Sequence, residues 1–308
     1  MPPIALALAA SMGRAYAQDK VIKIGAPLPI TGGLAPEGTK QRQGYDLWAE
    51  EVNKAGGIKV GDTRYRVQFV YYDYESATPK AVQLTERLIT DDKVNFMFSP
   101  FGSGATKASS NVNEKYQIPT IASTASSEQV YDQGFKYLFG TLNSNAIVAK
   151  ALIDQLKMGA PNVKTVAIYS RNDLFPLAIA TSLQQAAKPN GYEVGYFEKY
   201  PINAADHATA LTEMRAKKLD WIFVSGYTDD LIRIRKQMVD LKVTAPVVSM
   251  LAGPAYPDFT KALGDAANGV TSITWWHPDL RFKSPDVFGS TENYVRLFEA
   301  KYKQTPDY

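Results

Sequence analysis

Two short turns rich in glycine and hydroxyl groups contain the residues of this sequence best suited to bind an anion. Residues 100–106 (PFGSGAT) follow the apolar run 95–99 and lead into a helix expected from about Lys107, and residues 122–127 (ASTASS) follow the strand-like segment 118–121. In an open parallel sheet, ligands bind at the carboxyl ends of the strands, where helix N-termini offer unpaired N–H groups to a carboxylate or phosphate. The same composition also fits two ordinary loops with serine and threonine caps. The turns alone leave both interpretations open.

The first turn does not match a nucleotide-binding motif. Gly102 and Gly104 follow a predicted strand, but the dinucleotide fingerprint needs another glycine three residues later, where Lys107 stands. No Walker A sequence is present in the chain. We therefore expect no nucleotide cofactor.

A serine hydrolase is a second use of this turn that the sequence supports only weakly. The nucleophile elbow G-x-S-x-G fails around Ser103, because Phe101 and Ala105 stand where it needs glycine. The base would have to be His207 or His277, the two histidines of a chain that has no cysteine. This composition also leaves little for a zinc site. The sequence therefore predicts neither an enzyme nor a metal site, with a hydrolase as a remote alternative.

Three aromatic residues and a pair of acids stand at further strand ends. Phe101, Phe175 and Tyr227 each fall at the carboxyl end of a predicted strand, a position that suits the wall of a cleft better than a core. Asp229 and Asp230 follow soon after, where acids in the first turn of a helix complement its macrodipole. The aromatic residues therefore favour ligand contact, whereas the acids fit either a helix start or a ligand.

The segments that must position these residues alternate between strand and helix. Residues 21–25, 64–72, 95–99 and 118–121 are predicted strands, separated by amphipathic helices such as 40–55. A βαβαβαβ pattern predicts a parallel sheet with helices on both faces.

The same alternation restarts in the second half of the chain. Residues 137–145 interrupt the rhythm without a long linker, and a last strand is expected over 268–276. We therefore predict an α/β fold of two Rossmann-like lobes with parallel sheets, joined by a hinge. Lobe I is expected to contain residues 18–142 and 275–308, and lobe II residues 143–274.

Composition and the chain ends restrict location and partners. The apolar run 1–10 precedes a small-x-small cleavage site at 15–17, so residues 1–17 are interpreted as a signal peptide of an exported, periplasmic protein, although the usual basic head is missing. The formal net charge is +3 and no basic run stands out, which argues against nucleic acid as a partner. The chain stops directly after a predicted helix, so we expect that its C-terminus is truncated.

The ordered set of these segments resembles the type I periplasmic solute-binding proteins of ABC importers, in their branched-chain amino acid (Leu/Ile/Val) branch. The resemblance covers nearly the whole mature chain, and its motifs include residues 24–32 (IGAPLPITG), 51–58 (EVNKAGGI), 102–106 (GSGAT), 118–126 (IPTIASTAS) and 263–269 (LGDAANG). It implies two lobes on a three-strand hinge that close on a small solute, an ABC permease in the inner membrane as partner, and a monomer without cofactor or catalysis.

The resemblance also implies which first-lobe groups hold a carboxylate. These are the hydroxyl groups of Ser103, Thr124 and Ser126 and the backbone N–H groups of Thr124, Ala125 and Ser126. Short hydroxyl side chains and helix-end N–H groups bind a carboxylate without burying a cation.

Aromatic residues are implied for the other walls. Phe175 corresponds to the aromatic residue of the second lobe that closes over the solute, and Tyr227 to a second aromatic contact. Phe101 would add a first-lobe wall, and Glu37 is expected near the cleft rim.

One position departs from the pattern of amino-acid binders. They carry an acid in the second lobe that pairs with the ammonium group, and here the matching residue is Ala252. An ammonium buried without a counter-charge is costly. Either Asp229 or Asp230 substitutes, or the solute is an aromatic or aliphatic carboxylate or an amide without an amino group. A ligand-sensing module of the same fold is a further alternative.

Overall fold

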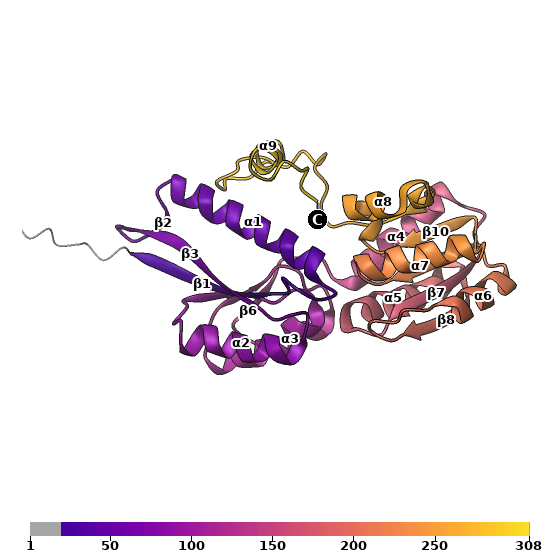
Figure 1. The fold of residues 1–308 in the computed structure, drawn as a ribbon, viewed down its shortest axis with the longest axis horizontal. Coiled ribbons are helices and arrows are strands. Elements are labelled where there is room, and N and C mark those ends of the chain that lie inside the picture. Colours follow the sequence, from indigo (N-terminus) through magenta and orange to yellow (C-terminus); the bar gives the residue numbers. More distant parts are fainter. Residues whose placement is uncertain (1–19, 308) are drawn as a thin grey trace, which may run out of the picture.

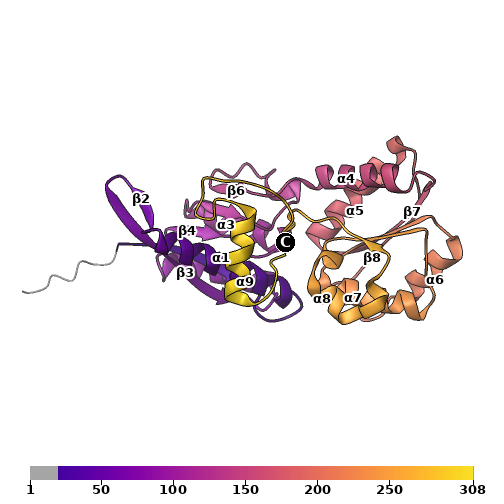
Figure 2. The ribbon, with the colours of Figure 1, turned by 90° about the horizontal axis from the view of Figure 1, so that it is seen from above.

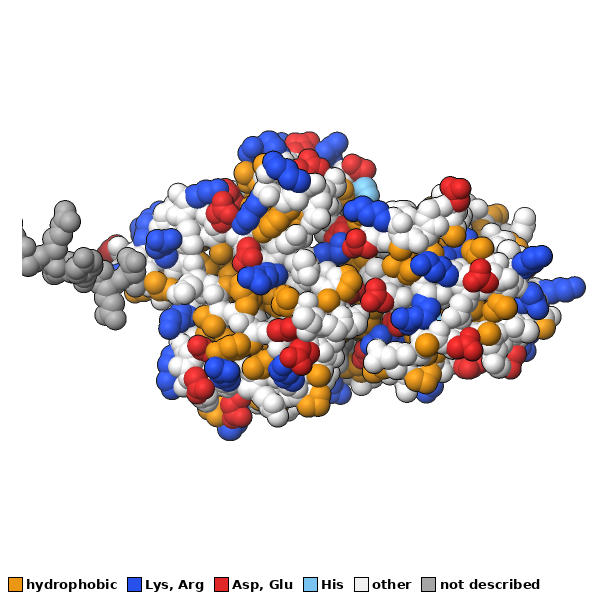
Figure 3. All heavy atoms as spheres, viewed as in Figure 1, with side chains coloured by type: hydrophobic (Ala, Val, Ile, Leu, Met, Phe, Trp, Pro, Cys, Tyr) orange, Lys and Arg blue, Asp and Glu red, His pale blue; other side chains and the backbone are white. Residues whose placement is uncertain are grey.

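The computed structural model describes residues 20–307 and divides them into two lobes that lie side by side along the long axis of the molecule (Figure 1). The expected signal peptide, residues 1–17, lies outside the described residues. On the face shown in Figure 3, acidic and basic side chains are interspersed over both lobes. Within the described part of the chain, no helix is long and apolar enough to cross a membrane.

The first lobe is built on a six-stranded sheet with the order β2-β3-β1-β4-β5-β6. Its strands are β1 (Val21–Leu28), β2 (Ile58–Val60), β3 (Thr63–Asp73), β4 (Phe96–Phe98), β5 (Thr120–Ala122) and β6 (Leu138–Gly140). All neighbours run parallel except β2 and β3, which form an antiparallel hairpin. Helix α1 (Ala35–Lys54) covers one face, and α2 (Thr78–Thr90) and α3 (Ser103–Lys115) cover the other (Figure 1). The last five residues of β1 are all buried, as expected for a strand covered on both faces.

The second lobe repeats this plan with a five-stranded, fully parallel sheet in the order β11-β10-β9-β7-β8. Its strands are β7 (Thr165–Arg171), β8 (Glu193–Tyr200), β9 (Trp221–Ser225), β10 (Val247–Met250) and β11 (Val270–Thr271). Its helices are α4 (Asn145–Gly159), α5 (Leu174–Ala187), α6 (Ala208–Lys217), α7 (Thr228–Asp240) and α8 (Pro257–Leu263). Two largely parallel sheets confirm the predicted α/β class.

The chain crosses between the lobes twice. It leaves the first lobe after β6, and after β11 it returns, so that α9 (Thr291–Tyr302) lies across α1 (Figure 2). The Lys301 ammonium contacts the Glu50 carboxylate at 2.7 Å, and the Tyr302 hydroxyl donates to the Gln43 carbonyl at 3.0 Å. The last helix is therefore part of the first lobe by its contacts.

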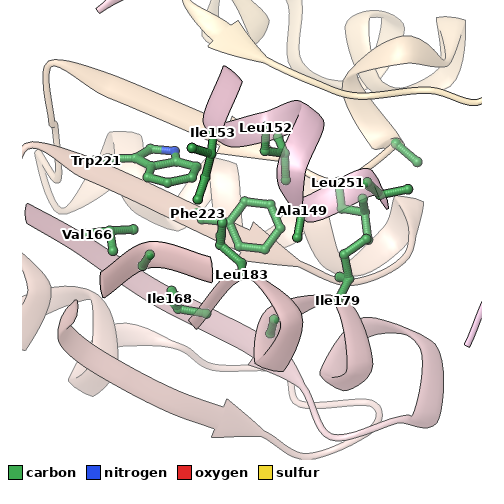
Figure 4. Packing of buried hydrophobic residues seen from close by; sticks show 14 of the residues in the cluster. Ala149, Leu152, Ile153, Val166, Ile168, Ile179, Leu183, Trp221, Phe223 and Leu251 are labelled. Atoms are coloured by element: carbon green, nitrogen blue, oxygen red, sulfur yellow. The ribbon is translucent and has the colours of Figure 1, made fainter. Parts of the chain in front are cut away.

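The largest core lies in the second lobe, between β9 and the helices α4 and α5 (Figure 4). Trp221 and Phe223 of β9 are fully buried there against Leu152 and Leu183. The Trp221 indole N–H donates to the Ser249 hydroxyl at 2.9 Å, so the polar end of this side chain is also satisfied.

Three predicted boundaries are wrong, each for a local reason. Helix α1 begins at Ala35, five residues before the expected start, because proline is favoured in a first helical turn and Pro36 stands there. Helix α3 begins at Ser103, four residues before the expected Lys107, because Gly102 adopts a φ of +80° and turns the chain directly into the helix. The strand expected over 268–276 is reduced to Val270–Thr271. Beyond it the Ser272 side chain donates to the Met250 carbonyl, and the chain leaves the sheet.

Replacing Phe223 tests this core. Phe223→Ala should lower the free energy of unfolding by about 3–5 kcal/mol, because it deletes a fully buried ring and leaves a cavity. Urea unfolding followed by circular dichroism measures the change. Met158 is 83% exposed on α4, so Met158→Ala should stay within about 0.5 kcal/mol of the wild type. Equal effects of the two substitutions would contradict this packing.

Candidate functional site

A cavity between the two lobes is lined by residues from both. The first lobe contributes Glu37, Phe101, Gly102 and Thr124, and the second lobe Phe175, Gly226, Tyr227, Thr228, Leu251, Ala252, Gly253 and Tyr256. The cavity has a volume of about 20 Å³, room for about one water molecule. A second cavity of about 90 Å³ adjoins it and shares Glu37, Phe101, Thr124 and Tyr256.

The carboxyl ends of parallel strands from both sheets supply these residues. Phe101 follows β4 and Thr124 follows β5 in the first lobe, whereas Phe175, Tyr227 and Ala252 follow β7, β9 and β10 in the second. Ligands bind at this end of open parallel sheets, and here two such ends share one cavity.

Aromatic rings from the two lobes meet across the cavity. The rings of Phe101 and Tyr227 pack edge to face with centroids 5.6 Å apart, and those of Phe175 and Tyr227 are 6.1 Å apart. A Cβ atom on Gly102 would lie 3.1 Å from the Tyr227 hydroxyl oxygen, so a side chain at position 102 would press on this ring. Burial raises the pKa of the Tyr227 phenol well above 10, which keeps its hydroxyl protonated.

A buried ion pair supports Tyr227. The Arg171 guanidinium contacts the Asp230 carboxylate at 2.8 Å and lies 5.1 Å from the centre of the Tyr227 ring. The same carboxylate accepts the backbone N–H of Tyr227 at 3.2 Å. Asp173 contacts Arg171 at 3.5 Å and caps α5 through the N–H of Leu174. Asp230 is therefore fully engaged with its own lobe.

Glu37 lies deeper than the rim position expected from the sequence. It stands in the first turn of α1, only 4% of it is exposed, and its Oε1 accepts the N–H of Thr228 across the cavity at 3.1 Å. Its Oε2 has no hydrogen-bond partner among the described residues. Burial raises the pKa of this carboxyl group.

Among the described hydroxyl side chains of the two turns, only that of Thr124 belongs to a residue of the cavity wall, and it accepts the Gly102 N–H at 3.2 Å. Ser103 is fully buried, and its hydroxyl accepts the N–H of Ser127 at 3.1 Å. The Ser126 hydroxyl donates to the Asn145 side chain at 2.8 Å. Ser103 and Ser126, like the fully buried Ala125, thus lie behind the wall and join the turns to each other and to α4. The N–H groups of residues 124–126 donate no hydrogen bond within the described part of the chain.

Two further second-lobe positions were considered for an acid that pairs with an ammonium group, and only one of them lies on the cavity wall. Asp229 is exposed and absent from the cavity wall, whereas Ala252 lies on it. Ala252 has a φ of +61°, a backbone conformation that disfavours residues other than glycine.

Sequence reasoning missed Thr228, Leu251 and Tyr256 as wall residues. All three stand shortly after β9 or β10, so the strand-end rule that selected Tyr227 could have selected them too.

The residues of a hydrolase are not brought together. The hydroxyl of Ser103 contacts a backbone N–H, whereas His207 is buried in the second lobe with its Nδ1 2.8 Å from the Tyr169 hydroxyl oxygen. His277 is half exposed and contacts Asp279. Among the described residues, no group of three or more acids and histidines could hold a metal ion.

Known proteins match this chain in both sequence and fold. A model of the family described as "Periplasmic binding protein" matches residues 21–308. The Leu/Ile/Val-binding protein homolog 8 of Brucella abortus (strain 2308) is 29% identical over 295 residues, which are 92% of this chain and 71% of that protein.

Solved structures agree with this match. The branched-chain amino acid transporter substrate binding protein LivJ of Streptococcus pneumoniae, in complex with isoleucine, has a TM-score of 0.82 at 26% identity and covers 94% of this chain and 79% of its own. A solute binding protein of an ABC transporter from R. palustris, in complex with benzoate, has a TM-score of 0.79 at 22% identity. The match covers 93% of this chain and 76% of that protein. The chain belongs to the periplasmic binding protein family.

Proposed function

We propose that this protein is the extracytoplasmic solute-binding component of an ABC importer, and that it captures a small carboxylate-bearing solute, such as a branched-chain amino acid, between its lobes. The observation that carries the proposal is one cavity walled by aromatic side chains from both lobes: Phe101 from the first, and Phe175 and Tyr227 from the second. Apolar walls with a few polar groups are typical of sites for small molecules.

The first-lobe turns supply donors for the carboxylate. The Thr124 hydroxyl is on the wall. Within the described residues, the N–H groups of residues 124–126 and of the start of α3 donate to no backbone carbonyl outside that helix. A helix N-terminus favours a negative charge there. Ser103 supports the site from behind the wall, because its hydroxyl accepts the N–H of Ser127 and so holds the turn of residues 122–127 in place.

Capture requires the lobes to move. A cavity of about 20 Å³ is far smaller than an amino acid, so the solute enters when the lobes separate, and the lobes then close around it with a wider cavity than the one seen here. The interlobe contacts that would break include the bond from Thr228 N–H to Glu37 and the 3.3 Å ion pair between Lys40 and Asp258. The closed form presents both lobes together to a permease.

The relatives support the solute class to different degrees. The Pseudomonas aeruginosa relative, 24% identical over 274 residues, is named for binding leucine, isoleucine, valine, threonine and alanine. The LivJ structure holds isoleucine at 26% identity. The benzoate complex, at 22% identity, supports the fold alone. An amino acid is therefore the first solute to test.

Solute-dependent stabilisation tests the proposal. Isoleucine, leucine or valine at about 100 times its dissociation constant should stabilise the protein by about 2.7 kcal/mol and raise its melting temperature by several degrees. Differential scanning fluorimetry measures the shift, and leucinol, which lacks the carboxylate, is the control and should have little effect. If neither amino acids nor aromatic acids raise the melting temperature, the solute-binding role loses its basis.

Thr124 tests the carboxylate site. Thr124→Val keeps the shape but removes the wall hydroxyl, so the affinity for a bound amino acid should fall about 10-fold, or about 1.4 kcal/mol. Titration calorimetry measures it. Thr209 is exposed on α6, so Thr209→Val should bind like the wild type. An unchanged affinity of Thr124→Val would remove this residue from the site.

Gly102 tests the closed geometry. Gly102→Ala should weaken solute binding because its Cβ meets the Tyr227 hydroxyl at 3.1 Å and because its φ is +80°. Gly134→Ala carries the same kind of backbone strain, with a φ of +71°, but its Cβ meets nothing within 4 Å. Both variants should lose stability by about 1 kcal/mol, and only Gly102→Ala should also lose affinity. Equal affinities would show that the contact with Tyr227 is irrelevant to closure.

A further inference from the structure

We propose that Glu37 supplies the negative charge that pairs with an ammonium group of the solute, so that the protein selects amino acids over carboxylates that lack an amine. The inference rests on the proposed function and names the solute class of the same site. The geometry behind it is a buried carboxylate that the first lobe places in the interlobe cavity.

Glu37 is the only charged side chain on the wall of this cavity among the described residues. Its Oε1 accepts the N–H of Thr228, and its Oε2 is buried without a hydrogen-bond partner in the same part of the chain. Burial of the carboxylate therefore carries a desolvation cost that the hydrogen bond to its other oxygen offsets only in part. A cationic donor from the solute would remove that cost.

The other acids near the cavity are committed elsewhere. Asp230 forms the ion pair with Arg171, and Asp173 contacts the same guanidinium and caps α5. Asp229 is exposed and off the wall. Ala252, at the position where amino-acid binders carry an acid, has no charge. Glu37 therefore replaces from the first lobe the charge that is absent from the second.

The charge balance of the wall favours a solute with both charges. No lysine or arginine of residues 20–307 lines the cavity, and Lys40, which lines the adjoining one, contacts Asp258 and Asp307. A solute with a carboxylate alone would bring a second negative charge close to Glu37. In an amino acid, the ammonium group can face Glu37 while the carboxylate faces the N–H groups of the first-lobe turns. Burial raises the pKa of Glu37, and a neighbouring ammonium would oppose that shift.

Glu37→Gln removes the charge and keeps the size and the oxygen that accepts the Thr228 N–H. The test titrates wild type and variant with two matched pairs: leucine and 4-methylpentanoate, and phenylalanine and 3-phenylpropanoate. Each second member lacks only the amine. Wild type should bind the amino acid of a pair at least about 10-fold tighter than its partner. Glu37→Gln should weaken amino-acid binding by about 10- to 100-fold and leave the partner unchanged or tighter.

The controls separate the charge from other effects. Glu213 is exposed on α6, so Glu213→Gln should bind all four compounds like the wild type. Circular dichroism and the melting temperature establish that Glu37→Gln is folded. A folded variant that loses both members of a pair by the same factor, or wild type that binds both equally, overturns the role of Glu37 and leaves solute binding intact. If wild type binds none of the four compounds, the proposed function fails, and the inference fails with it.

Discussion

The site depends on the parallel direction of the strands that lead into it, β4 and β5 in the first sheet and β7, β9 and β10 in the second. Parallel strands deliver all their carboxyl ends to one edge, and the two crossings of the chain set the edges of the two sheets against each other. Residues far apart in sequence, such as Glu37, Thr124 and Tyr227, therefore meet in one cavity. Each lobe alone would offer half of these walls to solvent.

In the second lobe, a buried ion pair supports the wall of the cavity. Arg171 and Asp230 are both almost fully buried, and removing either partner would leave the other uncompensated, which is strongly destabilising. The Arg171 guanidinium lies against the Tyr227 ring, and the Asp230 carboxylate accepts the backbone N–H of Tyr227. The first lobe uses weaker means, a chain of hydroxyl and amide bonds between its two turns.

The sequence was sufficient to predict the α/β class, the two parallel sheets and the position of Phe101, Phe175 and Tyr227, because strand ends follow from periodicity. It was not sufficient for Ser103, whose side chain turns away from the cavity to hold Ser127. Side-chain direction within a turn depends on backbone angles such as the positive φ of Gly102. The depth of Glu37 was missed because it results from the packing of α7 against the start of α1, a contact between residues 191 positions apart.

The bond from Thr228 to Glu37 has a consequence for how affinity is set. In the proposed mechanism, groups of the protein itself join the lobes in the closed form, so the open and closed forms would differ in free energy without any solute. The apparent dissociation constant is the intrinsic one divided by the population fraction that can admit the solute. Interlobe contacts outside the cavity wall, such as the ion pair between Lys40 and Asp258, act on the same equilibrium. Evolution can therefore adjust the working range of such a protein by changing the balance between conformers and leaving the recognition surface unchanged.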